Sequence, residues 1–168
     1  IADVNTEPDI PLLHAMRVGA HRDFIAKQYV LFFRDIFNHD LIWDAKNNNK
    51  ESKKIIEEVD CKENLEKFVQ KIYFCWLVKQ QDTHIARKFG TKLSKIIQNE
   101  ACSLLLGENF KQVDLKTNNV NIKELSEKQL LYWDYSLKQR NINPGTSADL
   151  TVCTLFLAYV FMPNLKYF

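Results

Sequence analysis

Residues 150–162 form an almost continuous apolar segment, which constrains the fold more than any other part of the chain. Asp149 directly precedes it, no charged residue lies within it, and Pro163 follows. A helix that is apolar on nearly all sides belongs in the middle of a helical bundle. The segment is too short to span a bilayer, so we expect no membrane partner. The pattern therefore predicts a buried C-terminal helix that ends before Pro163.

Helical patterns recur along the rest of the chain. Apolar residues fall at steps of three and four in 65–77 and again in 85–104. Gly90 inside the second pattern predicts a kink or a close approach, and Gly107 after it predicts a C-cap. Ser126 and Gln129 have the spacing of a capping box. Residues 12–37 contain no proline and predict one long helix, bent near Gly19.

Glycine and proline are scarce, at four residues each, which argues against a turn-rich β-sandwich. We therefore expect an all-α protein, a single bundle of about five or six helices. Residues 1–11 are acidic and contain proline, so they predict a leader or linker, and residues 12–168 a single helical domain.

Charge and cysteine content narrow the functional classes. The net charge of +2 is spread without a basic block, so nucleic acid is not an expected partner. None of the four cysteines lies in a Cys-x-x-Cys pair, which favours free thiols in a reducing compartment. No secretory signal opens the sequence. We expect a soluble cytoplasmic protein.

The segment Asn-Pro-Gly-Thr-Ser-Ala-Asp-Leu, residues 143–150, precedes the apolar run. A helix that begins here presents unpaired N–H groups from Gly145, Thr146 and Ser147, a setting that suits phosphate. Asp149 could then hold a divalent metal beside a polyphosphate. The alternative is a plain helix cap, with Thr146 at the N-cap and Asp149 three residues later.

Two other polar clusters interrupt apolar helices. They consist of Arg22, Asp23 and Lys27, and of Asp82, Arg87 and Lys88. Each combines a carboxylate with basic side chains that can meet phosphate oxygens. The alternatives are a surface ion pair for the first cluster and a capped helix with a solvated basic face for the second.

The three clusters, in this order, resemble the triphosphoribosyl-dephospho-CoA synthase family. The matching segments are 22–29 (Arg-Asp-Phe-Ile-Ala-Lys-Gln-Tyr), 82–90 (Asp-Thr-His-Ile-Ala-Arg-Lys-Phe-Gly) and 134–150, which includes the Asn-Pro-Gly-Thr motif. The chain is similar to the C-terminal part of a divergent branch. The resemblance implies an all-helical pentosyltransferase that moves the 5-triphosphoribosyl group of ATP to 3′-dephospho-CoA or a related acceptor, releasing adenine.

This reaction sets the expected roles. Displacement at an anomeric carbon requires a carboxylate near the reacting centre, a cradle for the triphosphate, and an apolar slot for adenine. The expected carboxylates are Asp149, Asp82 and Asp23, the first two also as ligands of Mg²⁺. The expected phosphate-binding residues are Gly145, Thr146, Ser147, Arg87, Lys88, Arg22 and Lys27.

Two other functions remain open at this point. A partner-dependent or non-catalytic nucleotide-binding module would need a missing N-terminal segment or a second subunit. A helical metal-dependent phosphohydrolase would use His39 and Asp40, a pair reminiscent of the His-Asp ligands of such enzymes.

Overall fold

The computed structural model describes residues 9–39, 62–107 and 125–161, and within these ranges it contains helices and no strand. The all-α prediction is confirmed. Eight helices occur in these three ranges, more than the five or six expected. They are α1 (Leu12–Gly19), α2 (Phe24–Val30), α3 (Arg34–Phe37), α6 (Lys62–Lys79), α7 (Thr83–Phe89), α8 (Thr91–Leu106), α9 (Glu127–Gln139) and α10 (Gly145–Phe161).

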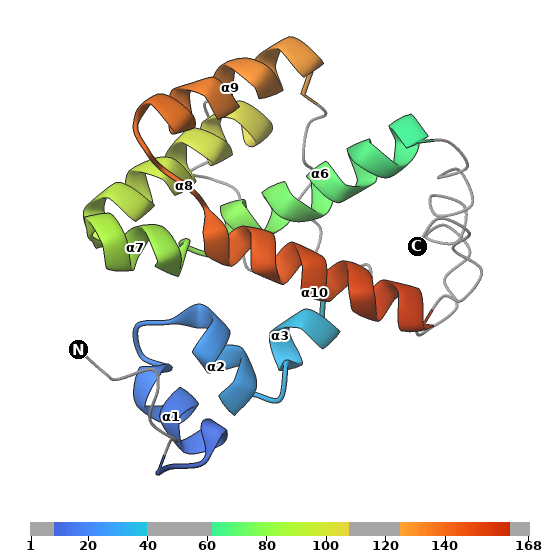
Figure 1. Cartoon of the computed structure of the whole chain (residues 1–168). Helices are drawn as coiled ribbons and strands as arrows, with labels where there is room; N and C mark the ends of the chain where they lie inside the picture. Colours follow the sequence, from blue (N-terminus) through green and yellow to red (C-terminus); the bar gives the residue numbers. More distant parts are fainter. Residues whose placement is uncertain (1–8, 40–61, 108–124, 162–168) are drawn as a thin grey trace.

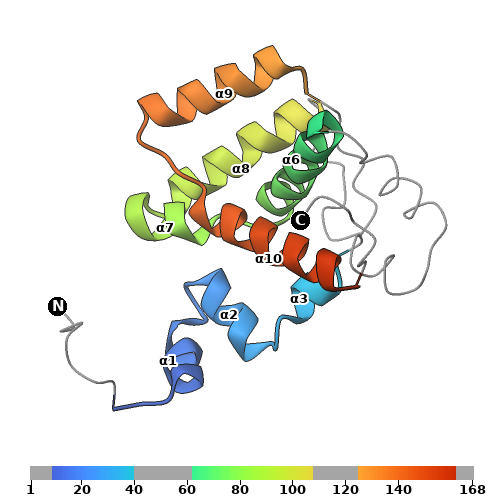
Figure 2. The same ribbon diagram turned by 45° about the vertical axis from the view of Figure 1, so that its right-hand side comes forward.

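The C-terminal helix α10 occupies the centre of the arrangement. It packs along α6 and also contacts α2, α3 and α7. Figures 1 and 2 show α10 between the N-terminal helices α1–α3 and the larger group formed by α6–α9. The predicted central position of this helix is therefore confirmed.

Two apolar clusters form the core, and α6 contributes to both. One lies among α6, α8 and α9 and includes Phe74, Ile97 and Trp133. The other joins α6 to α2, α3 and α10 through residues such as Phe24 and Leu150. A helix that is apolar on two faces can hold both groups of neighbours, so α6 connects the two halves of the described chain.

One face of α10 departs from the prediction of a helix enclosed on every side. Val152 is 67% exposed and Phe156 is 63% exposed. The buried face instead carries hydroxyl groups, because Thr151 Oγ1 donates to the carbonyl of Ser147 at 2.7 Å and Thr154 Oγ1 donates to that of Leu150 at 2.8 Å. These internal bonds satisfy the hydroxyls and allow that face to be buried.

The prediction of one long helix over residues 12–37 is wrong, because two breaks divide it into α1, α2 and α3. Asp23 is the N-cap of α2, and its Oδ1 accepts from the backbone N–H of Ile25 at 2.9 Å and of Ala26 at 3.1 Å. Phe32 and Phe33 then adopt φ of 51° and 59° between α2 and α3. The spacing of apolar residues does not reveal either break, because neither break changes the helical period.

Several other local predictions are confirmed. The amphipathic pattern over 65–77 lies within α6. Gly107 is the C-cap of α8, as expected. At Gly90, however, the predicted helix over 85–104 is divided rather than kinked, because Gly90 at φ 93° ends α7 before α8 begins at Thr91. Ser126 and Gln129 form the capping box of α9. Such glycines suit a positive φ because they have no Cβ.

The described cysteines Cys75, Cys102 and Cys153 form no disulfide bond. Cys61 lies outside the described ranges. None of the described helices combines the length and apolar character that crossing a membrane requires.

Candidate functional site

Three helices begin close together in space although their starts are far apart in sequence. Asp23 caps α2, Asp82 caps α7, and Gly145 is the first residue of α10. A chain of hydrogen bonds joins these starts. The Thr83 hydroxyl accepts from Phe24 N at 3.1 Å and lies 3.0 Å from the Thr146 hydroxyl.

The Thr146 hydroxyl also accepts from the backbone N–H of His84 at 2.9 Å. Thr146 is therefore not the N-cap of its own helix, as the plain-cap interpretation requires, since α10 begins one residue earlier at Gly145. Its side chain instead caps the neighbouring helix α7. A hydroxyl shared between two helix starts satisfies backbone donors that would otherwise lack partners.

Asp82 lies inside this junction and is only 1% exposed. Its Oδ1 accepts from Ile85 N at 3.1 Å, while its Oδ2 accepts from the backbone N–H of Ser147 at 2.8 Å and from the Ser147 hydroxyl at 2.9 Å. Hydrogen bonds to an ionised carboxylate are among the stronger ones in proteins. Asp82 thus joins the first turns of α7 and α10.

Gly145 allows α10 to approach α7 closely. A Cβ at this position would lie 3.1 Å from Nδ1 and 3.2 Å from Cγ of His84. Those distances are shorter than ordinary van der Waals contact, so a larger residue would require the His84 ring to shift. The Pro-Gly motif therefore supplies a close contact between helices.

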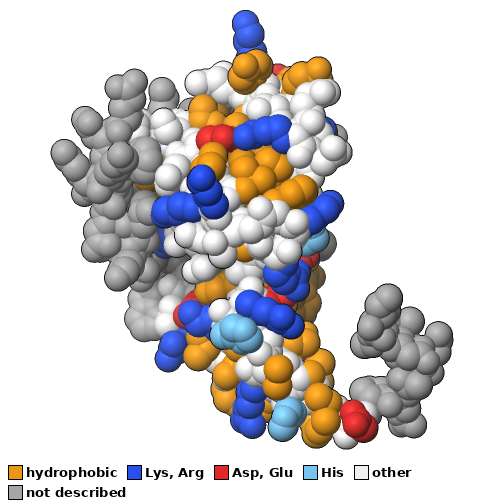
Figure 3. All heavy atoms as spheres, turned by 90° about the vertical axis from the view of Figure 1, so that its left-hand side faces the viewer, with side chains coloured by type: hydrophobic (Ala, Val, Ile, Leu, Met, Phe, Trp, Pro, Cys, Tyr) orange, Lys and Arg blue, Asp and Glu red, His pale blue; other side chains and the backbone are white. Residues whose placement is uncertain are grey.

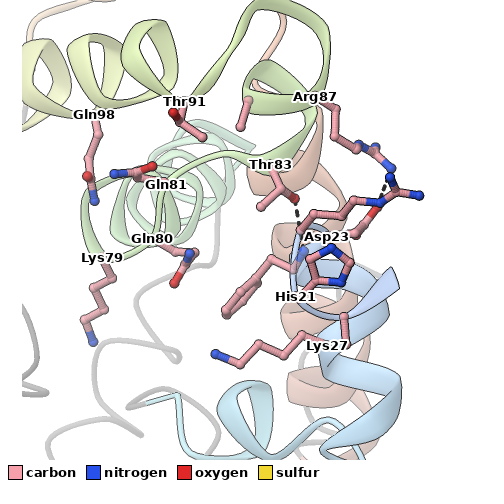
Figure 4. A pocket seen from close by; sticks show the side chains of 14 residues that line it. His21, Asp23, Lys27, Lys79, Gln80, Gln81, Thr83, Arg87, Thr91 and Gln98 are labelled. Carbon is pink, nitrogen blue, oxygen red and sulfur yellow. Dashed lines mark hydrogen bonds and ion pairs between the residues drawn. The ribbon is translucent and has the colours of Figure 1, made fainter. Parts of the chain in front are cut away.

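A cavity of about 1060 Å³ opens beside the junction, among α2, the end of α6, α7 and α8. Figure 4 shows its side chains, and Figure 3 shows Lys and Arg side chains outnumbering acidic ones on the face where α7 lies. Among the described residues that line the cavity, four are Lys or Arg and one is a carboxylate. The basic residues are Arg22, Lys27, Lys79 and Arg87, and the carboxylate is Asp23.

Asp23 and Arg87 form an ion pair at the edge of this cavity, between Asp23 Oδ2 and Arg87 Nη1 (Figure 4). The Asp23 side chain is 17% exposed and that of Arg87 is 51% exposed. Asp23 Oδ1 caps α2, whereas Asp23 Oδ2 forms the ion pair with Arg87. An arginine head that remains half exposed can also reach an anion in the cavity.

The lining includes residues that the sequence motifs did not predict as site residues. They are His21, Lys79, Gln80, Gln81 and Gln98, together with apolar and small side chains. The polar run at 79–81, between an amphipathic helix and Asp82, was an available signal. No sequence signal identified Gln98, because its position in a helical pattern does not show that its side chain points from α8 toward α6.

Other expected site residues lie elsewhere. Lys88 is exposed, with Nζ 5.2 Å from the centre of the Phe89 ring, and it does not line the cavity. Two expected phosphate donors are already used, since Ser147 N–H bonds to Asp82 and Gly145 N–H donates to the Asn143 carbonyl at 2.8 Å.

Asp149 also lies outside the cavity lining and is exposed. Its position two residues after Ser147 turns it by about 200° around α10, away from the contact that Ser147 makes with Asp82. Among the described residues, no group of three or more His, Cys, Asp or Glu side chains is arranged to hold a metal ion. Asp82 is buried and Asp149 is exposed, and the Mg²⁺ site expected at these two carboxylates stays a prediction.

His39, the candidate metal ligand of the phosphohydrolase alternative, is buried, and its ring lies 5.2 Å from that of Trp76. Burial, with the nearby Lys79 ammonium, lowers its pKa to about 4. His39 is therefore neutral at pH 7. Its expected partner, Asp40, lies outside the described residues.

Nearly the whole sequence also matches a known family. The sequence model of the CitG family, described as ATP:dephospho-CoA triphosphoribosyl transferase, matches residues 1–166. No curated protein and no solved structure matches the chain.

Proposed function

The chain belongs to the ATP:dephospho-CoA triphosphoribosyl transferase family, and we propose that it transfers the triphosphoribosyl group of ATP to 3′-dephospho-CoA or a related acceptor. The family is a transferase family, and the match covers nearly the whole chain. The observation that carries the proposal is the excess of basic side chains around the 1060 Å³ cavity.

A triphosphate is the part of ATP that this cavity suits best. Arg22, Lys27, Lys79 and Arg87 approach it from three separate helices or their flanking turns, so cations surround the space on several sides. Arginine binds phosphate oxygens in pairs, and lysine adds a mobile point charge. Among the described lining residues a single carboxylate opposes them, which leaves a net positive lining for a polyanion.

Asp23 is the carboxylate in the best position to assist the chemistry. In the proposed reaction the bond between ribose C1′ and adenine breaks, and C1′ forms a new bond to the acceptor oxygen. The acceptor hydroxyl loses its proton, and the departing adenine gains one. A carboxylate can take that proton or stabilise the positive charge that develops at C1′.

The ion pair with Arg87 provides a way to make Asp23 available. Phosphate oxygens compete with Asp23 Oδ2 for the Arg87 guanidinium, so a bound triphosphate would draw Arg87 away and release Oδ2. Oδ1 would continue to cap α2 and hold the side chain in position. Asp149, exposed on the first turns of α10, is the alternative carboxylate, and an Asp149→Ala variant tests it in the same assay.

The proposal is tested by incubating the purified chain with ATP, Mg²⁺ and 3′-dephospho-CoA and separating the products by chromatography. We expect free adenine, at a rate at least tenfold lower in Arg87→Ala. Lys128→Ala is the matched control, because Lys128 is an exposed residue of α9 outside the cavity. Its rate should stay within twofold of the parent.

The products also separate the competing functions. If the chain binds ATP but releases adenine only after a second polypeptide is added, it is the partner-dependent module. Release of phosphate from ATP, with adenine still attached to the nucleotide product, would indicate a phosphohydrolase. Either outcome would reject transfer by this chain alone.

A further inference from the structure

A second cavity, of about 360 Å³, lies between α6, α9 and the turn that leads into α10. It shares no described lining residue with the basic cavity. Both cavities use α6 or its end, since Tyr73 borders the second and Gln80 the first. Gln80 directly follows α6 and lies about 10 Å beyond Tyr73 along the helix axis.

Aromatic rings form much of the wall of this second cavity. The rings of Tyr73 and Phe74 lie 5.3 Å apart, and those of Phe74 and Trp133 lie 5.5 Å apart. Leu130, Leu137 and Ile142 add aliphatic surface. Aromatic and aliphatic walls of this kind favour a flat, largely apolar ring.

Polar groups at the same cavity suit the edge of a nitrogen heterocycle. Asp134 and Asn143 line it and offer oxygen acceptors to an amino group. Trp133 Nε1 is buried without a hydrogen-bond partner among the described residues, and a ring nitrogen is the kind of acceptor that this donor lacks. The hydroxyl of Tyr73 stays neutral, because burial and the carboxylates of Asp82 and Asp134 raise its pKa.

Charge makes this cavity a poor place for a polyphosphate. Lys138 is the only basic residue among its described lining, and the Lys138 ammonium is paired with Asp134 at 2.6 Å. The volume is near the lower end for small-molecule sites, which suits a nucleobase better than a whole nucleotide. The ligand chemistry that remains is a neutral bicyclic heterocycle with an exocyclic amine.

We infer that this cavity binds the adenine ring of a nucleotide substrate, beside the turn that leads into α10. The inference rests on the proposed function for the identity of the substrate, and ATP and dephospho-CoA both carry this ring. The turn at Asn143 and Pro144 borders the adenine cavity, and the α10 start that follows reaches α7 through Gly145. The same motif would therefore position both binding sites.

Adenosine, which has no phosphate, is the probe that isolates this cavity, and equilibrium dialysis against the full chain measures its Kd. Leu130→Trp should fill the cavity and raise that Kd at least tenfold. Leu131→Trp is the matched control, because Leu131 is 60% exposed on the same helix and does not line the cavity. Its Kd should remain within twofold of the parent value, and circular dichroism should show both variants folded.

Purine riboside provides a second test, because it lacks the exocyclic amine. The parent chain should bind adenosine at least fivefold more tightly than purine riboside, and Asp134→Ala should remove that preference. The Asp134 side chain is 53% exposed, so its loss should leave the fold intact. Dialysis of ATP and of dephospho-CoA against Leu130→Trp identifies the source, since the substrate whose ring enters the cavity should lose affinity.

Adenosine that fails to bind the parent chain, or that binds Leu130→Trp as well as the parent, would overturn the inference. Unchanged affinity of Leu130→Trp for both ATP and dephospho-CoA would also overturn it. Failure of the proposed transfer looks different. Adenosine would still bind and lose affinity in Leu130→Trp, while the full reaction would release no adenine.

Discussion

Asp82 Oδ2 accepts two hydrogen bonds from Ser147, one from its backbone N–H at 2.8 Å and one from its hydroxyl at 2.9 Å. The two residues lie 65 positions apart in the chain. Through this contact a buried carboxylate from the start of α7 holds the first turn of α10. The relationship gives Asp82 a positioning role, because its oxygens point into the helix junction and not into the basic cavity.

Replacing Asp82 should therefore destabilise the protein. Asp82→Ala leaves the N–H groups of Ile85 and Ser147 buried without an acceptor, which should lower the free energy of unfolding by roughly 3 kcal/mol. Urea denaturation followed by circular dichroism measures this loss. Asp149→Ala should change stability by less than about 0.5 kcal/mol, because it removes an exposed side chain. Equal losses in the two variants would contradict the positioning role.

Asp23→Asn separates the charge of Asp23 from its capping function. Asparagine caps helices as well as aspartate does, so α2 should persist. The neutral amide can neither take a proton nor stabilise positive charge, and adenine release should fall by about 100-fold or more. Product chromatography gives the rate, and a thermal melt checks the fold. A folded Asp23→Asn variant that kept the parent rate would show that the carboxylate is dispensable.

Gly145→Ala should crowd the His84 side chain and destabilise the protein by about 1–3 kcal/mol. The opposite sign is expected for Gly19→Ala, whose new Cβ would meet Ala26 Cβ at an ordinary 3.5 Å, and which should stabilise by about 0.5 kcal/mol. Chemical denaturation compares the two. Adding His84→Ala to Gly145→Ala should recover part of the lost stability. If the stability loss of the double variant equals the sum of the two single losses, this contact is not the cause.

His39 should make stability depend on pH. Its pKa in the folded state is about 4, against 6.5 for the ordinary side chain, so the unfolded chain binds more protons between these values. Stability from this residue is complete above pH 6.5 and is lost as the pH falls toward 4. About 2 kcal/mol should disappear between pH 7.5 and pH 5.

Urea titrations at several pH values measure that loss, and His39→Gln supplies the control because glutamine does not titrate. The variant should lose less stability than the parent over the same range. Parallel pH profiles for the two proteins would show that another group is responsible.

Much of the local structure could be predicted from residue order. Ser126 and Gln129 satisfy each other within one helical turn, so three residues of spacing suffice to identify their capping box. The break at Asp23 was missed because an aspartate inside an apolar pattern can either cap a new helix or face solvent. Which of these occurs depends on Thr83, whose hydroxyl accepts a hydrogen bond from the backbone N–H of Phe24, 59 positions earlier in the chain.

The candidate site, too, could be predicted only in part from the sequence. Asp23, Arg22, Lys27 and Arg87 were selected from sequence clusters, and the structure brings all four to one cavity. Lys88 and Asp149 came from the same kind of cluster but lie outside that cavity. Adjacent positions on a helix differ by about 100°, so membership of a cluster does not determine which way a side chain points.

Local patterns of residues were enough to establish the helical class, the central apolar helix and the chemical types of side chain near each helix start. Those features depend on periodicity, capping and composition, which act over a few residues. Only the folded chain shows that Ser147 encloses Asp82 and that Arg87 meets Asp23 at a basic cavity. These outcomes depend on how α2, α7 and α10 pack, and packing joins groups whose separation along the chain carries no local signal.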